Sequence, residues 1–370
     1  WNFSLRMAIG TSTSDPVFSR RSCPRTLRPL AARSKLHSAR GELVVVVLHF
    51  HNDDVTDCGW DTSLSIEIPQ GTQSGYWIAR LTTKGVKSDV PFFISVKPGL
   101  SNAKLLFIAP TATYMAYANT HIKFDSHNTE NLYEAPMALS EDELFLNLHR
   151  EFGLSHYDTH HDHSGVIYCS SDRPMLNVRP GLYTFNYVND THILKWLEKE
   201  GFEYDVATDS ELHKHGMSLL APYRVVMTGS HPEYYSTQMW DAVSEYQDSG
   251  GRHMYMGGNG FYWRIAYSPD SDSVIENRRG VSGVRTWEGE PGEHHLSFTG
   301  EPGGLWRTNG RPPQKLVGVG FSATLFIKST YFVRSEESKH QSIDFIFRGI
   351  LSKRIGDYGF RGGGCVGLEI

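Results

Sequence analysis

The stretch Tyr223-Arg-Val-Val-Met-Thr-Gly-Ser-His-Pro-Glu-Tyr-Tyr-Ser236 decides the fold. Its apolar start, Tyr223 to Thr228, predicts a buried strand, and Pro232 prevents a strand or helix from running through the segment that follows. Ser236 is a good N-cap for a helix with apolar residues at helical spacing, which Gly250-Gly251 ends. The stretch therefore predicts the first strand, loop and helix of a β-loop-α-β unit.

Polar residues follow both strands of this unit. The second buried strand is predicted over Arg252 to Met256. In open α/β sheets, ligands bind outside the carboxyl ends of the strands. His231 and Glu233 follow the first strand, and Asn259 follows the second. We therefore expect a His, a Glu and an Asn at one edge of a sheet.

The rest of the chain predicts three parts. Residues 1–42 lack periodicity and read as an irregular segment to which we assign no function, although the chain begins at Trp1 and both its ends suggest cuts through a longer polypeptide. Residues 43–98 predict a small β-sandwich-like module. Residues 99–370 predict an α/β catalytic domain, truncated at its C-terminus, with a doubly wound, mostly parallel sheet. Its further expected helices are 140–152, 191–200 with Asp190 as N-cap, and 209–215; its further expected strands are 103–109, 202–206, 317–327 and 344–347.

Composition excludes some classes of function. The net charge is −5, and residues 1–42 carry eight Lys or Arg against two acids, so the remaining chain is strongly acidic and a poor partner for nucleic acid. No apolar run approaches the roughly 20 residues that a membrane span needs. The four cysteines, at positions 23, 58, 169 and 365, lack metal or redox spacing. We expect them to be reduced and the protein to be cytoplasmic.

Several polar clusters could carry chemistry. His156-Tyr-Asp-Thr-His-His-Asp-His163 is dense enough in imidazoles and carboxylates for zinc, although its spacing matches no strict zinc motif. The residues around Asp54 could also suggest a metal, but we interpret them as a solvated strand end. Tyr114 and Tyr117 follow the strand 103–109, where aromatic packing is the simpler explanation for two tyrosines. No Gly-x-Ser-x-Gly motif occurs, which disfavours a serine hydrolase.

Five motifs in one order resemble the large (beta) subunit of N,N-dimethylformamidase over roughly residues 46–370. The resemblance implies a glutamine-amidotransferase-like α/β fold, and a family N-terminal β-sandwich and further C-terminal chain that lie outside this sequence. It also implies a small partner subunit and larger oligomers. The motifs are Pro110-Thr-Ala-Thr-Tyr-Met-Ala-Tyr-Ala-Asn119, Tyr157-Asp-Thr-His160, Ser230-His-Pro-Glu-Tyr234, Gly257-Gly-Asn-Gly-Phe-Tyr-Trp263 and Gly362-Gly-Gly-Cys-Val-Gly-Leu-Glu369.

The resemblance further implies one mononuclear ferric iron ion held by two tyrosines and a glutamate. Carried over by motif, these ligands are Glu233, Tyr157 and Tyr117, with Tyr114 as the less favoured choice for the last. Three anionic oxygen ligands suit a hard ferric ion, which would polarise an amide carbonyl and lower the pKa of water bound to it.

The resemblance implies three supporting catalytic residues. Glu369 is the candidate base for water, and His231 the candidate acid for the leaving amine. Asn259 is the candidate donor to the oxyanion, an effect worth roughly 3–4 kcal/mol in comparable sites.

The function expected from the sequence is iron-dependent hydrolysis of a small N-substituted formamide to formate and an amine. Two alternatives stay open. One is a zinc-dependent hydrolase that uses the segment from His156 to His163. The other is a non-catalytic, amidotransferase-like binding subunit.

Overall fold

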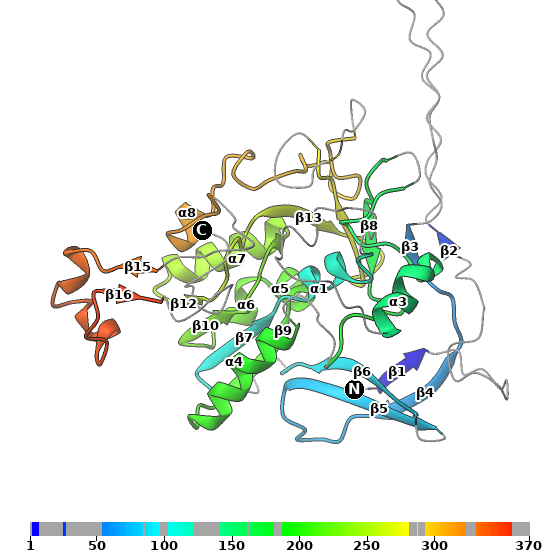
Figure 1. Cartoon of the computed structure of the whole chain (residues 1–370), viewed down its shortest axis with the longest axis horizontal. Coiled ribbons are helices and arrows are strands. Elements are labelled where there is room, and N and C mark those ends of the chain that lie inside the picture. Colours follow the sequence, from blue (N-terminus) through cyan, green and yellow to red (C-terminus); the bar gives the residue numbers. More distant parts are fainter. Residues whose placement is uncertain are drawn as a thin grey trace, which may run out of the picture.

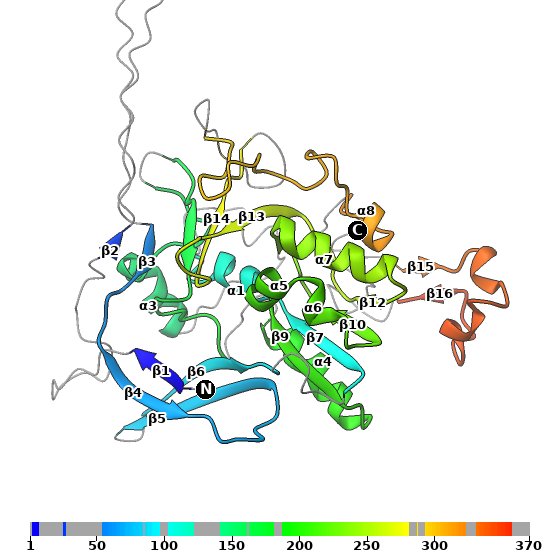
Figure 2. The ribbon, with the colours of Figure 1, turned by 180° about the vertical axis from the view of Figure 1, so that it is seen from behind.

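The computed structural model describes residues 2–6, 25–26, 54–83, 86–96, 103–121, 141–160, 163–180, 187–280, 287, 293–322 and 331–356. Within them, a parallel sheet with helices on both faces lies beside a second, mixed sheet, and a β hairpin packs below (Figure 1). The view from behind shows α5 and α7 across one face of the parallel sheet (Figure 2).

The parallel sheet has the strand order β12-β10-β7-β9. Its strands are β7 (Leu105–Ala109), β9 (Tyr204–Thr208), β10 (Val225–Thr228) and β12 (Arg252–Tyr255). All three pairings are parallel, and β7 and β10 pair as the sequence predicts. Their carboxyl ends therefore point to one edge, where the loops with the polar residues begin.

Alternating residues of the sheet face two sets of helices. Leu106 and Val226 belong to the larger core with helices α5 (Asp209–His215), α6 (Met217–Leu220) and α7 (Thr237–Asp248). Phe107 and Met227 face the other way, against Leu194 and Leu197 of helix α4 (Tyr187–Lys199). Each such fully buried side chain contributes about 1.5–3 kcal/mol to the stability of the fold.

Helix ends follow local sequence signals in two cases and not in a third. Ser236 accepts a hydrogen bond from the backbone N–H of Met239 and so caps α7 as expected. Thr208 and Glu211 form a capping box at α5. The prediction that Asp190 caps the next helix is wrong, because α4 begins at Tyr187 and the Asp190 carboxylate accepts hydrogen bonds from Tyr114 and Ser230 instead.

Other predicted elements differ in kind. The strand β12 is not buried, because it lies at the end of the sheet and leaves Met254 42% exposed. Residues Gln314–Val317 form helix α8, ended by Gly318 in the left-handed region, so the strand predicted from Val317 is wrong where the chain is described. The other predicted strand, Asp344–Phe347, is a 3-10 helix, η3, with no buried residue to place against a sheet.

The second sheet has the order β11-β13-β14-β8. It comprises β8 (Tyr168–Ser170), β11 (Tyr234–Tyr235), β13 (Trp263–Tyr267) and β14 (Val274–Asn277). Only the pairing of β11 with β13 is parallel, so the predicted domain 99–370 is not uniformly parallel. Because β11 follows Glu233 directly, one short loop joins the two sheets.

The N-terminal β structure contacts the parallel sheet. Strands β5 (Gly75–Thr83) and β6 (Val86–Ile94) form an antiparallel hairpin. Ser74, just before it, accepts a hydrogen bond from the N–H of Val206 and donates one to Asp205, 3.0 Å in each case. Residues 1–42, predicted to be irregular, contribute strands β1 (Asn2–Arg6), which pairs with β4 (Thr62–Glu67), and β2 (Arg25–Thr26), which pairs with β3 (Val55–Asp57).

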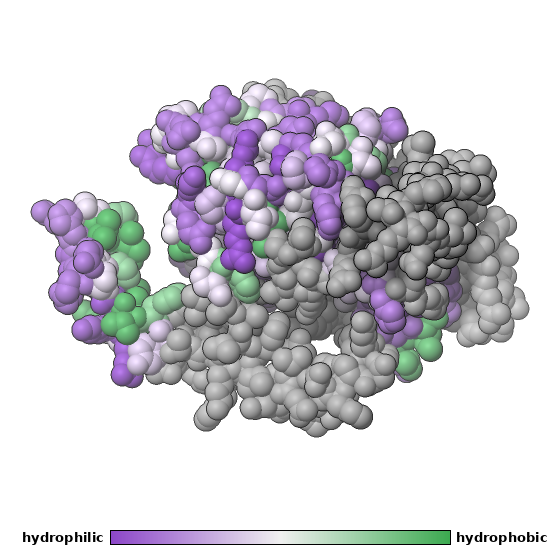
Figure 3. Space-filling model, turned by 90° about the horizontal axis from the view of Figure 1, so that it is seen from above, coloured by the Kyte–Doolittle hydropathy of each residue, from purple (hydrophilic) through white to green (hydrophobic). Residues whose placement is uncertain are grey.

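The remaining elements are short. Helices α1 (Thr111–Tyr117), α3 (Glu141–Leu148) and η1 (Arg150–Phe152) lie near the second sheet. Strands β15 (Phe332–Val333) and β16 (Arg354–Ile355), with η2 (Glu337–Lys339) and η3, form a segment that projects from the body. This segment carries exposed apolar side chains, among them Leu351 at 99% exposure (Figure 3).

The cysteines correct one expectation. Cys169 is free and buried, but Cys58 is disulfide-bonded. The prediction that all four cysteines are reduced is therefore wrong for Cys58, and the argument for a cytoplasmic location loses its premise. Among the described helices, none has the length and apolar character needed to cross a membrane.

We predict that Ser236→Ala lowers the free energy of unfolding by about 1–2 kcal/mol, because α7 loses its N-cap. Ser236 also bonds His213, at 2.8 Å, which adds to the loss. Urea unfolding followed by circular dichroism measures it. Ser244→Ala, the same change inside α7, should be neutral or slightly stabilising because alanine favours helix interiors; equal losses in the two variants would contradict the capping role.

Candidate active site

Thr113 of α1 joins this helix to the loop after β10 by two hydrogen bonds, and we call this pair of bonds the clamp. The hydroxyl of Thr113 donates to the carbonyl of His231, at 2.8 Å, and accepts from the N–H of Glu233, at 3.1 Å. Thr113 is fully buried, and its hydroxyl makes one donated and one accepted hydrogen bond inside the protein. The clamp fixes Glu233 next to Tyr117, the last residue of α1.

Three oxygen-bearing side chains converge at this point. The Tyr117 hydroxyl donates to Oε2 of Glu233, at 2.9 Å. The Tyr157 hydroxyl lies 3.1 and 3.2 Å from the two oxygens of Glu233 and 2.7 Å from the Tyr117 hydroxyl. The two tyrosine rings stack with centroids 4.2 Å apart. The three predicted metal ligands are thus mutual neighbours although they come from distant segments.

Tyr114 lies on the other side of α1. Its hydroxyl bonds the Asp190 carboxylate and lies 2.8 Å from the Tyr76 hydroxyl. Its ring packs with Phe93 and Tyr187. Of the two tyrosines that the sequence leaves open, Tyr117 is therefore the one beside Glu233, and Tyr114 packs as an aromatic core residue.

Two of the predicted supporting residues also touch Glu233. Nε2 of His231 lies 3.2 Å from Oε2, and Nδ2 of Asn259 donates to Oε1 at 3.4 Å. Both side chains are buried, at 5% and 7% exposure. The expected His, Glu and Asn thus gather at the edge where β10 and β12 end. Glu369 lies outside the described residues.

The histidine-rich segment from His156 does not gather around one point. His156 bonds the carbonyl of Val166, at 3.0 Å, and burial lowers its pKa to about 4. His160 pairs with Asp54, at 3.0 Å. Asp158 accepts hydrogen bonds from the N–H and hydroxyl of Ser155, at 2.8 and 3.0 Å.

These contacts fold the loop that presents Tyr157. Among the described residues, no group of three His, Cys, Asp or Glu side chains is placed to hold a metal ion; His161 and Asp162 lie outside those residues. Asp54 is also corrected, because it is buried and accepts from the N–H groups of Ile167 and Tyr168, and so is not a solvated strand end.

Sequence reasoning missed two residues of the site. The hydroxyl of Tyr234, on β11, donates to the Tyr157 hydroxyl at 2.7 Å. The guanidinium of Arg279, just after β14, stacks over the ring of Tyr157 at 4.2 Å and over that of Trp263 at 4.6 Å. Tyr234 stands next to Glu233 in the opening stretch and could have been found there, whereas nothing in the sequence points to Arg279.

Burial and charge dominate the electrostatics of the site. Burial, and then the Glu233 carboxylate, raises the pKa of both Tyr117 and Tyr157 well above the ordinary value of 10.0. Arg279 opposes this shift at Tyr157. Without a further cation the two phenols therefore stay neutral: Tyr117 donates to Glu233, and Tyr157 donates to Tyr117 or to Glu233.

The donor set fits a small, hard cation. Oxygen ligands at neighbouring octahedral positions, about 2.1 Å from such an ion, lie about 3 Å from one another. The oxygens of Tyr117, Tyr157 and Glu233 lie 2.7–3.2 Å apart, so they match this spacing. The amide Oδ1 of Asn259 is buried beside this donor set and has no hydrogen-bond partner among the described residues.

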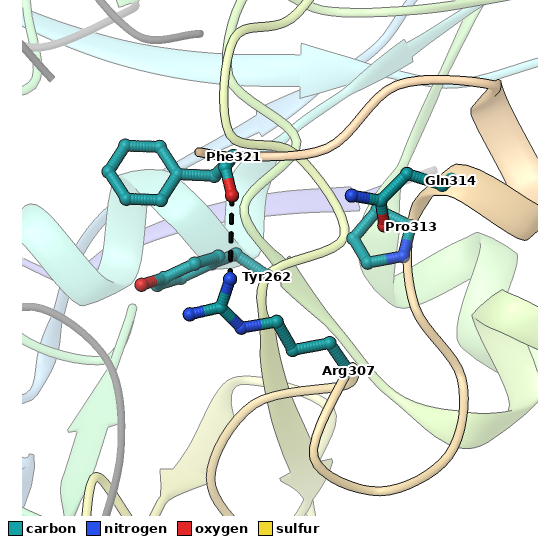
Figure 4. Close-up of a pocket in the computed structure, with 5 residues that line it drawn as sticks. All are labelled: Tyr262, Arg307, Pro313, Gln314 and Phe321. Atoms are coloured by element: carbon teal, nitrogen blue, oxygen red, sulfur yellow. Dashed lines mark hydrogen bonds between the residues drawn. The ribbon is translucent and has the colours of Figure 1, made fainter. Parts of the chain in front are cut away.

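A separate surface pocket is lined by Tyr262, Arg307, Pro313, Gln314 and Phe321 (Figure 4). Arg307 crosses it to donate to the carbonyl of Phe321, at 3.4 Å. The rings of Tyr262 and Phe321 meet edge to face at 5.4 Å. None of the predicted site residues lines this pocket.

Comparisons with known proteins agree with the resemblance in the sequence. A family model described as "N,N-dimethylformamidase beta subunit-like, C-terminal" matches residues 31–370. The chain is 39% identical over 332 residues to the N,N-dimethylformamidase beta subunit of Paracoccus aminophilus, and 38% identical over 330 residues to that of Alcaligenes sp.. Each alignment covers 87% of this chain and 43% of the relative, so the chain spans less than half the length of these relatives.

We predict that stability depends on pH through Asp190, which accepts a hydrogen bond from Ser230 in the loop after β10. Burial raises the pKa of its carboxyl from 3.8 to about 6. Between these values the native state holds a proton that the unfolded state releases, so the free energy of unfolding falls as pH rises, by at most about 1.4 kcal/mol per pH unit. Asp190→Asn should flatten this part of the stability curve, measured by urea unfolding at several pH values. An unchanged slope would contradict the assignment.

Proposed function

The chain belongs to the N,N-dimethylformamidase beta subunit-like family, and on that premise we propose that it hydrolyses a small N-substituted formamide to formate and an amine. The observation that carries the proposal is the convergence of Tyr117, Tyr157 and Glu233 from three separate segments. A buried carboxylate held against two half-buried phenols from distant segments is the oxygen-rich donor set that a hard cation prefers. We also propose that the chain has the glutamine-amidotransferase-like fold that the resemblance implies.

We propose that these three side chains hold one ferric ion. If all three were ionised, they would carry three negative charges. Arg279, stacked on the ring of Tyr157, offsets one of them. The remaining charge favours an ion of high positive charge with oxygen ligands. When bound, the ion would polarise the amide carbonyl and lower the pKa of water.

The chain's own polar groups supply proton transfer and orientation. His231 lies 3.2 Å from Glu233 and so stands beside the reacting atoms, where its imidazole can deliver a proton to the departing amine. The Nδ2 of Asn259 is 3.4 Å from the other Glu233 oxygen, a long contact that leaves an N–H available for the developing oxyanion. Glu369 is proposed as the base that takes the proton from water.

Zinc hydrolysis by the segment from His156 to His163 has less support. In this segment His156 bonds a backbone carbonyl and His160 pairs with Asp54, in place of each other. The third possibility, a non-catalytic binding subunit, is separated from the proposed enzyme by metal content and colour, because tyrosinate bound to iron absorbs visible light.

Assembly and location extend the proposal. The two relatives are named beta subunits, which supports a partner subunit for this chain also. That this partner is small and that the assembly is a larger oligomer is part of the proposal. A cytoplasmic location was predicted from reduced cysteines, and the disulfide at Cys58 removes that support.

We predict that Glu233→Gln and Tyr157→Phe lose the iron, the visible colour and dimethylformamide hydrolysis together, because each removes an anionic ligand. Tyr117→Phe should do the same. Iron is measured by elemental analysis and hydrolysis by formate release. Tyr114→Phe is the matched control, a tyrosine three residues from Tyr117 that should keep its iron; loss of iron in this variant alone would reverse the choice between the two.

We predict a different result for Glu369→Gln. As a base that is not a ligand, Glu369 can be neutralised without loss of the metal, so iron and colour should persist while turnover falls at least a hundredfold, in the range typical of general bases. The comparison is made in the assembled enzyme. Near-normal hydrolysis by this variant would remove Glu369 from the mechanism.

A further inference from the structure

The second sheet reaches the site through Tyr157. The loop before β8 carries Tyr157, while β11 carries Tyr234 and the residue pair after β14 carries Arg279. Tyr234 touches the oxygen of Tyr157 and Arg279 touches its ring, so the two contacts approach the same phenol from its edge and its face. Neither residue touches Glu233 by a hydrogen bond among the described contacts.

The next residue, Tyr235, provides a control for Tyr234. Tyr234 and Tyr235 are both fully buried and consecutive on β11, so their side chains point to opposite faces of the strand. The Tyr234 hydroxyl donates to Tyr157 at 2.7 Å. The Tyr235 hydroxyl has no hydrogen-bond partner among the described residues, and its ring packs on Phe261 at 4.3 Å.

Arg279, which stacks on Tyr157, is itself buried and hydrogen-bonded. It is 1% exposed, its Nη1 donates to the carbonyl of His156 at 2.9 Å, and its guanidinium lies between the rings of Tyr157 and Trp263. A buried cation needs compensation by negative charge or π density. The ring of Tyr157 supplies π density directly beneath the guanidinium.

We propose that Tyr234 and Arg279 are positioning residues that hold the oxygen and ring of Tyr157 where it would bind the metal. This inference rests on the proposed function. The Tyr234 O–H donates into the phenolate oxygen, and charge-assisted hydrogen bonds of this kind are about twice as strong as neutral ones. The Arg279 cation lowers the energy of the same phenolate through its ring.

Two effects on the iron-loaded protein follow. A hydrogen bond donated to a phenolate draws electron density from its oxygen, so removing that bond raises the energy of the phenolate electrons. The tyrosinate-to-iron absorption should then move to longer wavelength. Outer-shell partners of metal ligands also set affinity, and their loss typically weakens metal binding by about 10- to 100-fold.

The experiment compares Tyr234→Phe with Tyr235→Phe, each of which deletes one buried hydroxyl from the same strand. The absorption spectrum and the iron affinity, from competition with a chelator, are measured beside the thermal midpoint of the metal-free protein. We expect Tyr234→Phe to shift the band to longer wavelength and to weaken iron binding about tenfold or more. Tyr235→Phe should leave both unchanged.

Arg279→Lys and Arg279→Gln extend the test. Lysine keeps the charge but loses the planar stacking, so it should retain more iron than glutamine does. If Arg279→Gln fails to fold, Tyr234→Phe still decides. A band and affinity unchanged in a folded Tyr234→Phe protein, or changed equally by Tyr235→Phe, would overturn the inference.

The proposed function fails in a different way. If the wild-type protein itself binds no iron and has no colour, the ligand set is wrong and the roles of Tyr234 and Arg279 fall with it. A coloured wild-type protein with an unaffected Tyr234→Phe variant overturns only the positioning roles.

Discussion

The buried carboxylate of Glu233 is the constraint on which the site depends. It is 2% exposed, and a carboxylate so far from water must be compensated by donors or by a cation. Tyr117, Tyr157 and Asn259 supply hydrogen bonds and His231 lies within reach. Each comes from a different position in the chain, so satisfying this one group fixes the relative placement of four segments.

The site lies where two sheets of different character meet. The parallel sheet delivers Glu233, His231 and Asn259 through the loops at its carboxyl edge, and Tyr117 at the end of the helix after β7. The second sheet delivers Tyr157 and the residues that surround it. Because β11 begins at Tyr234, directly after Glu233, the loop at the end of β10 is also the start of the second sheet. A shift of one sheet against the other would therefore separate the two tyrosines.

Short-range signals explain why part of this arrangement was predictable. The apolar run before Gly229, the cap at Ser236 and the glycines at 250 and 251 act within a few residues, and they place a strand, a loop and a helix correctly. The same topology rule places Glu233 and Asn259 at one edge. The family motifs supply the ligand roles, which no local pattern provides.

Long-range contacts explain the failures. Asp190 looks like an N-cap but is drawn to Tyr114 and Ser230, residues far away in the chain. The strand at Arg252 reads as buried from its sequence, but among the described strands it is the last in its sheet and pairs only with β10. The sequence does not distinguish the environments of Tyr114 and Tyr117. They lie on different sides of α1, so Tyr114 packs in one hydrophobic cluster and Tyr117 packs against another beside Glu233.

The sequence by itself determined the β-loop-α-β unit, the polar residues at its edge and the membership of the chain in its family, because those depend on local propensity, strand direction and motif. Only the folded structure shows which tyrosine lies beside Glu233, that His156 and His160 bond Val166 and Asp54 while Tyr157 faces the site, and that Tyr234 and Arg279 contact that tyrosine. The role of a phenol depends on the charges and hydrogen-bond donors within a few ångströms of its oxygen. Those groups come from distant segments, and the spacing of these segments in the sequence does not predict that they are neighbours in the fold.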